Sequence, residues 1–111
     1  MNHFLTPRMQ IDLDTVLYLE GEGNYTFVVL TDGRRLLLSK SISFLLPRLP
    51  ADFFLRLSKK HVINLSFLNV ISFNNQERHV RLSTGLELEV SRRRATQMRR
   101  LGLEDSFLKC A

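Results

Sequence analysis

The chain has 111 residues, 44% of them hydrophobic, which is enough for the core of one domain and excludes a disordered chain. Its formal net charge is +5 and its sequence pI is about 10.0, which favours an acidic partner. The single cysteine, Cys110, excludes a disulfide framework and a cysteine-rich metal site. No apolar run is long enough to span a membrane and no secretion signal is visible, so we expect a cytoplasmic protein without membrane association.

The first part of the chain predicts three strands. Residues 16–19 are an apolar run without alternation, which is typical of a strand buried on both faces. Residues 25–30 are rich in aromatic and β-branched side chains, and residues 34–39 return as a third strand. The dipeptide Asp32-Gly33 between them predicts a hairpin with a type I′ turn.

A short kinked helix is expected near residues 41–49. Ser41 is a suitable N-cap, and apolar residues follow it at helical spacing. Pro47 removes a backbone donor, so it should shorten or kink this helix. Short strands are then expected over residues 53–57, 61–65 and 70–73.

The last part of the chain predicts a hairpin and a second helix. Residues 79–83 and 86–90 alternate across Thr84-Gly85, with Val80 and Leu82 on one face. In the returning strand the side chains expected to face the core are Leu86, Leu88 and Val90. A C-terminal helix near residues 92–102 follows, with Ser91 as a suitable N-cap, and no internal repeat is visible in the sequence. We therefore expect one mostly-β domain of short strands over residues 1–111.

The residues give little support for catalysis. His3, His61 and His79 are scattered, and none stands at metal-ligand spacing from another ligand. The segment Gly21-Glu22-Gly23 lacks the third glycine and the helix of a phosphate-binding loop. Glu20 and Glu22 would share one strand face, but nothing nearby completes an acid–base site. We predict that the protein is not an enzyme and binds neither a metal nor a cofactor.

Binding is better supported, because polar and basic residues gather at three strand ends. Strand ends and loops can place side chains from distant segments on one rim of a β scaffold. If they converge, lysine and arginine can hold phosphates, and Asn, Thr and Arg can read base edges. The five arginines of residues 92–100 would suit a polyanion. The three clusters are Asn24-Tyr25-Thr26, Ser58-Lys59-Lys60-His61 and Ser91-Arg92-Arg93-Arg94.

Several of these residues also have purely structural interpretations. Tyr25 could pack in the core, and Asn24 could serve the turn after Gly23. His61 could be a hydrogen-bonded histidine at the start of a strand. Of these residues, Arg92 is the one least readily explained as a charge that is merely exposed to solvent.

The succession of segments from residue 16 onward resembles a LytTR-type DNA-binding domain. It begins with Val-Leu-Tyr-Leu-Glu-Gly-Glu-Gly-Asn-Tyr-Thr at residues 16–26 and continues through the Asp32-Gly33 hairpin. Next come Ser41 at the start of a short helix, and Phe53 or Phe54 with Arg56. Lys-Lys-His-Val-Ile-Asn follows at residues 59–64. It ends with Glu-Val-Ser-Arg at residues 89–92, so the resemblance covers about residues 11–101.

This resemblance implies a fold and a mode of binding. The implied fold is an elongated set of small, mainly antiparallel sheets with about ten short strands and little helix. The implied function is that of a bacterial transcription regulator whose loops enter successive major grooves of double-stranded DNA. It places base-reading residues near Thr26, Lys59 and Arg92. Phosphate contacts are implied nearby, with Asn24, Lys40, Lys60, Arg93 and Arg94 as candidates, and Tyr25, Ser58, His61 and Ser91 as supporting residues.

The expected partner is double-stranded DNA with paired or repeated sites, bound by a weak or DNA-induced dimer. One alternative is a β domain that binds RNA or single-stranded nucleic acid, which needs exposed aromatic side chains such as Tyr25, Phe27 or Phe73. The other is a protein-interaction module whose basic residues meet an acidic partner.

Overall fold

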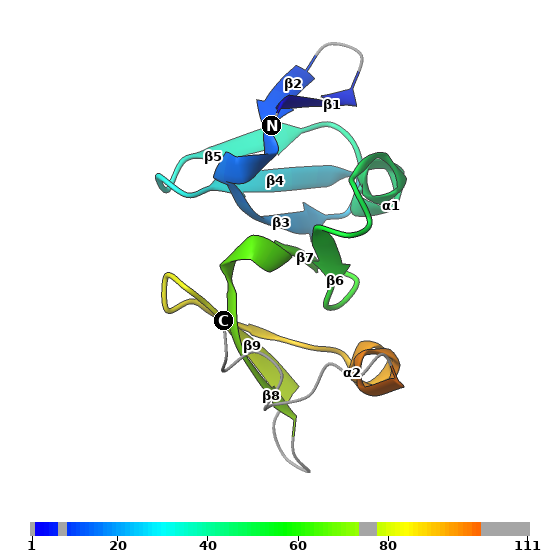
Figure 1. Cartoon of the computed structure of the whole chain (residues 1–111). Coiled ribbons are helices and arrows are strands. Elements are labelled where there is room, and N and C mark those ends of the chain that lie inside the picture. Colours follow the sequence, from blue (N-terminus) through cyan, green and yellow to red (C-terminus); the bar gives the residue numbers. More distant parts are fainter. Residues whose placement is uncertain (1, 7–8, 74–77, 101–111) are drawn as a thin grey trace.

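A computed structural model describes residues 2–6, 9–73 and 78–100 of the chain. These residues form ten strands in three antiparallel sheets, two short α-helices and three 3₁₀ turns. The molecule is elongated, with principal extents of 42 × 26 × 22 Å, and the sheets follow one another along its length (Figure 1). The predicted mostly-β architecture of short antiparallel strands is thereby confirmed.

The N-terminal hairpin and a five-stranded sheet make up one half of the molecule. The hairpin pairs β1 (Asn2–Thr6) with β2 (Met9–Asp12). The sheet has the order β5-β4-β3-β7-β6, in which every neighbouring pair is antiparallel. Its strands are β3 (Val16–Glu22), β4 (Tyr25–Leu30), β5 (Arg35–Leu38), β6 (Phe54–Arg56) and β7 (His61–Asn64).

The other half is a three-stranded sheet with a helix. The sheet has the order β10-β9-β8, and its strands are β8 (Leu68–Phe73), β9 (Arg78–Leu82) and β10 (Glu87–Glu89). Helix α2 (Arg92–Arg100) follows β10, and α1 (Ile42–Leu45) follows β5. The 3₁₀ turns are η1 (Leu13–Thr15), η2 (Leu46–Arg48) and η3 (Leu65–Phe67). The expected turn at residues 74–76 lies outside the described residues.

Strand β3 is buried on both faces, as its unbroken apolar run predicted. Val16 and Leu19 belong to a core that β3 shares with β4 and α1. Leu17 belongs to a second core, which includes residues of the three-stranded sheet and of α2. Strand β3 therefore contributes side chains to two cores. One core includes residues of α1 and the other includes residues of α2, so both helices are positioned by the same strand.

The β4–β5 hairpin forms where it was expected, but with a different turn. The Gly33 amide donates to the Leu30 carbonyl oxygen at 3.0 Å, and the Leu30 amide donates to the Arg34 carbonyl oxygen at 2.8 Å. Gly33 has a φ of 91°, whereas no described non-glycine residue, Asp32 included, has a positive φ. A type I′ turn needs positive φ at both central residues, so that prediction was wrong. The observed pattern is that of a longer hairpin loop with a glycine bulge.

The β9–β10 hairpin repeats this arrangement 52 residues later. The Leu82 amide donates to the Leu86 carbonyl oxygen at 2.8 Å, and Gly85 again has a φ of 91°. The preceding 3₁₀ turns correspond as well, because Asp12 caps η1 as Asn64 caps η3. The structure therefore contains an internal repeat that the sequence analysis did not detect.

Both helices follow a serine N-cap, and α1 together with the 3₁₀ turn η2 spans most of the helix predicted near residues 41–49. The Ser41 hydroxyl accepts a hydrogen bond from the Phe44 amide, and Pro47 falls in the 3₁₀ turn η2 that ends α1 early. The kink predicted from Pro47 is thus confirmed. In the last hairpin Leu88 and Val90 are buried, but Leu86 is 36% exposed, so its predicted core position was wrong.

Candidate nucleic-acid interface

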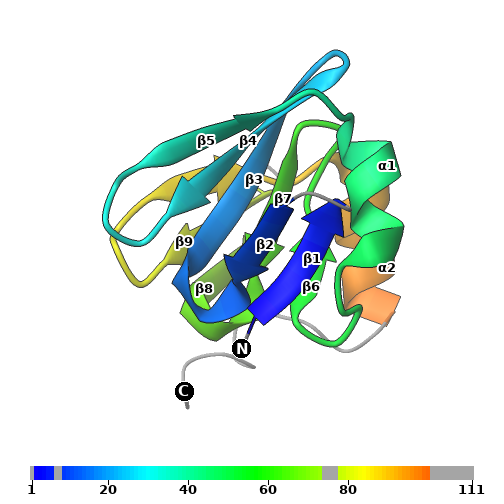
Figure 2. The ribbon, with the colours of Figure 1, turned by 90° about the horizontal axis from the view of Figure 1, so that it is seen from above.

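The loop between β6 and β7 lies between two other segments and is hydrogen-bonded to both. On one side the Gly21 amide donates to the Lys60 carbonyl oxygen at 2.7 Å. On the other side the Ser91 amide donates to the Leu57 carbonyl oxygen at 2.9 Å. Helices α1 and α2 lie on the same side of the molecule in both views (Figures 1 and 2). Three segments that are far apart in the sequence therefore form one continuous surface.

The loop itself is held by one serine and one arginine. The Ser58 hydroxyl accepts hydrogen bonds from the amides of Lys60, at 3.1 Å, and His61, at 3.2 Å. Arg56 donates from Nε to the Ser58 carbonyl oxygen at 2.9 Å and from Nη2 to the Lys59 carbonyl oxygen at 3.3 Å. These four bonds fix the backbone from which the exposed Lys59 and Lys60 side chains project.

Two hollows lie next to each other on this surface and share Arg56 and Lys59. The first, called here the turn-side hollow, reaches from the loop to the β3–β4 turn and the start of α1. The second, the helix-side hollow, reaches from the loop to the start of α2. Residues 21–23, 41–43, Arg56, Lys59 and Lys60 line the turn-side hollow. Arg56, Ser58, Lys59, Ser91, Arg93 and Arg94 line the helix-side hollow.

The third cluster lies at the N-terminus of α2. The Ser91 hydroxyl accepts from the Arg94 amide at 3.2 Å, the N-cap contact expected for this residue. Arg92 and Arg93 are exposed in the first turn, and Arg94 is half-buried, with Nη1 donating to the Gln97 side-chain oxygen at 3.3 Å. Ala95 and Met98 are buried, which fixes the helix orientation and turns the arginines away from the core.

The first cluster is divided, because Thr26 points into the protein. Its side chain is fully buried, and its hydroxyl donates to the Lys40 carbonyl oxygen at 2.7 Å. Asn24 and Tyr25 are exposed beside it, and Tyr25 is 51% exposed, so the interpretation of Tyr25 as a core residue was wrong. The structure thus brings Lys59 together with the arginines of α2 but does not add the Thr26 side chain to that surface.

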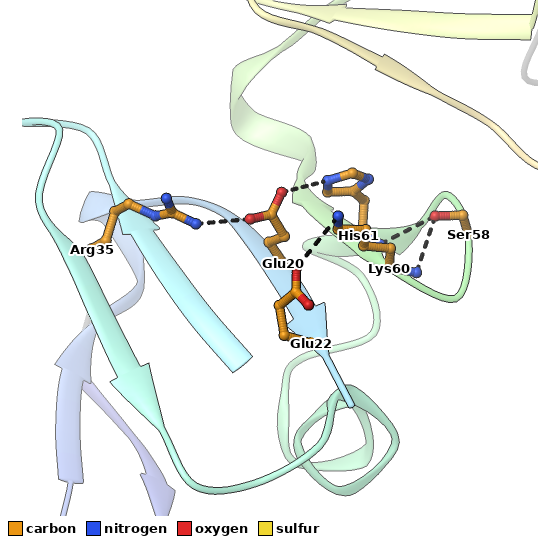
Figure 3. Close-up of polar contacts among 6 residues, drawn as sticks. All are labelled: Glu20, Glu22, Arg35, Ser58, Lys60 and His61. Atoms are coloured by element: carbon orange, nitrogen blue, oxygen red, sulfur yellow. Dashed lines mark hydrogen bonds and ion pairs between the residues drawn. The ribbon is translucent and has the colours of Figure 1, made fainter. Parts of the chain in front are cut away.

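Two glutamates of β3 hold cationic side chains near the loop (Figure 3). Glu22 lies 3.5 Å from the Lys60 ammonium nitrogen, and both side chains are more than half exposed. Glu20 accepts from Arg35 at 2.7 Å and lies 3.2 Å from Nε2 of His61. His61 is therefore a half-buried, hydrogen-bonded histidine, as its structural interpretation proposed.

Lys40 lies at the end of the hairpin that leads into α1. Its side chain is exposed, and its ammonium nitrogen is 4.8 Å from the centroid of the Phe44 ring. The Arg48 guanidinium lies 3.7 Å from the same centroid. Phe44 thus holds two cations at the edge of the surface by cation–π attraction.

Arg56 is a site residue that the sequence analysis did not single out. It lies within a strand pattern, where an arginine normally reads as a solvent-facing position. In the structure it is half-buried, and both its burial and the neighbouring charge of Arg94 lower the pKa of its guanidinium. The signal that could have revealed it is its position two residues before Ser58. Side chains two positions apart in a strand lie on the same face, so Arg56 is placed toward the polar segment Ser58-Lys59-Lys60.

The described residues contain no group of three or more His, Cys, Asp and Glu side chains that could hold a metal ion. Within the same residues, no helix is both long and apolar enough to cross a membrane.

Comparison with known families identifies the domain. The family model of the LytTr DNA-binding domain matches residues 8–102, which is most of the chain. The chain belongs to the LytTr DNA-binding domain family. That family is described as a DNA-binding domain.

A solved structure with this fold supports the assignment. It is described as the LytTr DNA-binding domain of a response regulator from Bacillus cereus. The TM-score is 0.74 at 20% sequence identity, and the match covers 91% of this chain and 94% of that one. No curated protein matches the sequence. At this identity the comparison shows that the two LytTr domains share a fold.

Proposed function

We propose that this LytTr domain binds double-stranded DNA sequence-specifically, as part of a transcription regulator in the bacterial cytoplasm. The observation that carries the proposal is the surface on which the Lys59 loop lies directly beside the start of α2. Lys59 and Arg92 are exposed there and are the side chains proposed to reach base edges in the major groove. Thr26, buried and bonded to Lys40, is not included in this set.

The surrounding side chains are proposed to contact the DNA backbone. Most of them are exposed cations or polar groups, and such contacts orient a protein on the duplex without reading its sequence. If about six phosphates are neutralised, log affinity should fall against log salt with a slope near −5. The proposed phosphate contacts are Asn24, Lys40, Lys60, Arg93 and Arg94, with Tyr25, Ser58, His61 and Ser91 as neighbouring or positioning residues.

The elongated shape suggests how a regulator with this domain would occupy its sites. A single side of the molecule carries the cationic segments, so one domain contacts one stretch of duplex. Paired or repeated sites one or two helical turns apart would bring two domains onto the same face of the DNA. We propose that dimerisation is weak, or is induced by DNA that contains two such sites.

A second candidate, single-stranded nucleic acid, is favoured by one observation. Tyr25 is half-exposed close to the cationic surface, and exposed aromatic rings can stack on unpaired bases. The Phe27 ring is less available, because the Arg35 guanidinium lies 4.3 Å from its centroid. The Phe73 side chain lies outside the described residues. Of the three aromatic residues expected to serve this mode of binding, only Tyr25 is shown to offer a free ring, which makes this candidate weaker than duplex binding.

Selection of bound duplexes from a random double-stranded pool tests the proposal. An enriched motif, present in pairs at one or two helical turns, is the expected result. Binding of single-stranded competitor with tenfold or greater preference over duplex would favour the second candidate. If duplexes are retained without any enriched motif, the protein binds DNA without sequence preference, and the proposal of sequence-specific recognition is overturned.

A further inference from the structure

The helix-side hollow concentrates positive charge without a compensating carboxylate. Four of its six lining residues are Lys or Arg, the other two are serines, and none is acidic. Other exposed arginines of this chain pair with an acid: Arg34 with Asp32 at 2.7 Å, and Arg81 with Glu87 at 3.3 Å. The turn-side hollow, by contrast, includes Glu22. The helix-side hollow is therefore the better-suited of the two for an anion.

Arg56 forms the floor of this hollow in a fixed orientation. Its bonds to the carbonyl oxygens of Ser58 and Lys59 use two of the five N–H donors of a guanidinium. The remaining donors are available to an oxygen-rich ligand. Arg56 and Arg94 line the same hollow as two like charges, and burial together with the charge of Arg94 lowers the pKa of Arg56. An anion placed between them would replace the repulsion of like charges with attraction.

The two serine hydroxyls add donors to the same hollow. Ser58 accepts the Lys60 and His61 amides, and Ser91 accepts the Arg94 amide. Each hydroxyl uses its oxygen as an acceptor in these bonds, so its own hydrogen is left to donate. The hollow thus offers hydrogen-bond donors and offers few acceptors, which matches a tetrahedral oxyanion.

We propose that the helix-side hollow is a site for one phosphate group, held by its three arginine side chains and its two serine hydroxyls, with Lys59 at its border. This inference rests on the proposed function, because the backbone of bound DNA is one source of such a group. Free phosphate is the other source with the same chemistry.

Titration of the full chain with inorganic phosphate, against chloride at matched ionic strength, tests the site directly. In ¹H–¹⁵N spectra we expect saturable shifts of the amides of residues 56–59 and 91–94. Arg94→Gln should weaken phosphate binding about tenfold, as expected for a lost charge-assisted contact. Arg34→Gln removes the same charge from a distant turn and is the matched control, for which less than about a twofold change is expected. Arg93→Gln, at an exposed position of the same hollow, is a second variant that leaves the Arg56 bonds to the loop intact and should also weaken phosphate binding.

Two further measurements distinguish the sources of the phosphate. If the DNA backbone occupies the hollow, inorganic phosphate should displace a bound duplex more than chloride does at equal ionic strength. Arg94→Gln should then abolish this excess and flatten the salt dependence by about one unit. Saturable phosphate binding without displacement of DNA would assign the hollow to a free phosphate ligand.

Unsaturable shifts, or equal effects of Arg94→Gln and Arg34→Gln, would overturn the proposed site. This outcome is separate from failure of the proposed function. A chain that binds phosphate in the hollow but no duplex would contradict DNA binding and keep the site. A chain that binds duplex but shows no phosphate binding in the hollow would support DNA binding and contradict the site.

Discussion

Gly21 and Ile42 approach so closely that there is no room for a side chain at position 21. A Cβ atom on Gly21 would lie 2.8 Å from Cδ1 and 3.2 Å from Cγ1 of Ile42, which is the first residue of α1 and is buried. The Gly21 amide also holds the Lys60 carbonyl oxygen of the loop. One glycine therefore joins the start of α1 to the loop that carries Lys59.

Replacement of this glycine should destabilise the domain. Gly21→Ala would force Ile42 out of its rotamer, at a cost of about 1 kcal/mol. Chemical denaturation monitored by circular dichroism measures the change in unfolding free energy. In the double variant Gly21→Ala with Ile42→Val, the loss of Cδ1 should make the two changes less than additive. Additive effects would show that the contact with Ile42 is not the cause of the destabilisation by Gly21→Ala.

A second prediction separates the structural role of Thr26 from base readout. Thr26→Val removes the hydroxyl that donates to the Lys40 carbonyl oxygen, so unfolding free energy should fall by about 1 kcal/mol. DNA affinity, measured where both proteins are fully folded, should change less than about twofold, because the side chain is buried. Thr31→Val, at an exposed position of the hairpin turn, is the control for the change of residue type. A large loss of sequence preference in Thr26→Val alone would return Thr26 to the base-reading set.

The position of Thr26 could have been predicted from the sequence. Thr26, Val28 and Leu30 alternate along one strand, and side chains at every second position share a face. This pattern places Thr26 inward with Val28. The family resemblance pointed to the region of Thr26, and the pleat of β4 shows that the exposed neighbours there are Asn24 and Tyr25.

Other features depend on contacts that the sequence does not reveal. Strands β3 to β10 and both serine caps follow from local patterns, and most were predicted within two residues, whereas the β1–β2 hairpin was not predicted. The adjacency of Lys59 and α2 depends on the Ser91–Leu57 hydrogen bond, which joins segments more than 30 residues apart. The internal repeat was missed because few identical residues remain, although Gly33 and Gly85 keep the same positive φ. The type I′ turn was predicted from the dipeptide Asp32-Gly33 alone. The sequence does not reveal that the Leu30–Arg34 hydrogen bond closes a loop one residue longer.

A third prediction concerns Glu22, whose carboxylate pairs with Lys60 on the proposed DNA surface. Phosphate must compete with this carboxylate for Lys60, so Glu22→Gln should increase affinity for any duplex. An exposed pair contributes about 0–1 kcal/mol, which corresponds to an increase of up to about fivefold. Fluorescence anisotropy with a random duplex measures it.

The matched control for Glu22 is Glu87→Gln, which removes an equal charge from the distant β10 strand. Long-range attraction alone would raise the affinity equally in both variants. An equal rise would therefore show that the Glu22–Lys60 pair has no specific influence on DNA binding.

A fourth prediction concerns the pH dependence of the β4–β5 hairpin. The Arg34 amide donates to the Asp32 carboxylate and, together with the Arg34 side chain, lowers the pKa of Asp32 below its ordinary value of 3.8. A lowered pKa in the folded state stabilises the protein above pH 3.8, and this stabilisation is lost as the pH falls through the lowered value. Wild type should therefore be more stable than Asp32→Asn near neutral pH.

The difference in unfolding free energy between these two proteins should shrink as the pH falls from 5 through the lowered pKa of Asp32, below which both side chains are uncharged. Urea denaturation across this range measures it. Asn keeps an oxygen that can accept the Arg34 amide but loses the oxygen that accepts from Arg34 Nε, so the comparison removes the charge together with this charge-assisted hydrogen bond. A difference that stays constant with pH would show that the carboxylate charge does not stabilise the turn.

The fifth prediction tests Arg92 as a base-reading residue. Arg92 is exposed at the first position of α2, and alanine is well tolerated in helices, so Arg92→Ala should fold normally. Its affinity for the selected duplex should fall by about 1–3 kcal/mol, with relaxed preference at one base pair and a smaller loss on random duplex. Arg81→Ala, on β9 and paired with Glu87, is the control of equal charge. Equal losses of Arg92→Ala on both duplexes would instead make Arg92 a phosphate contact, because backbone contacts weaken binding to all sequences alike.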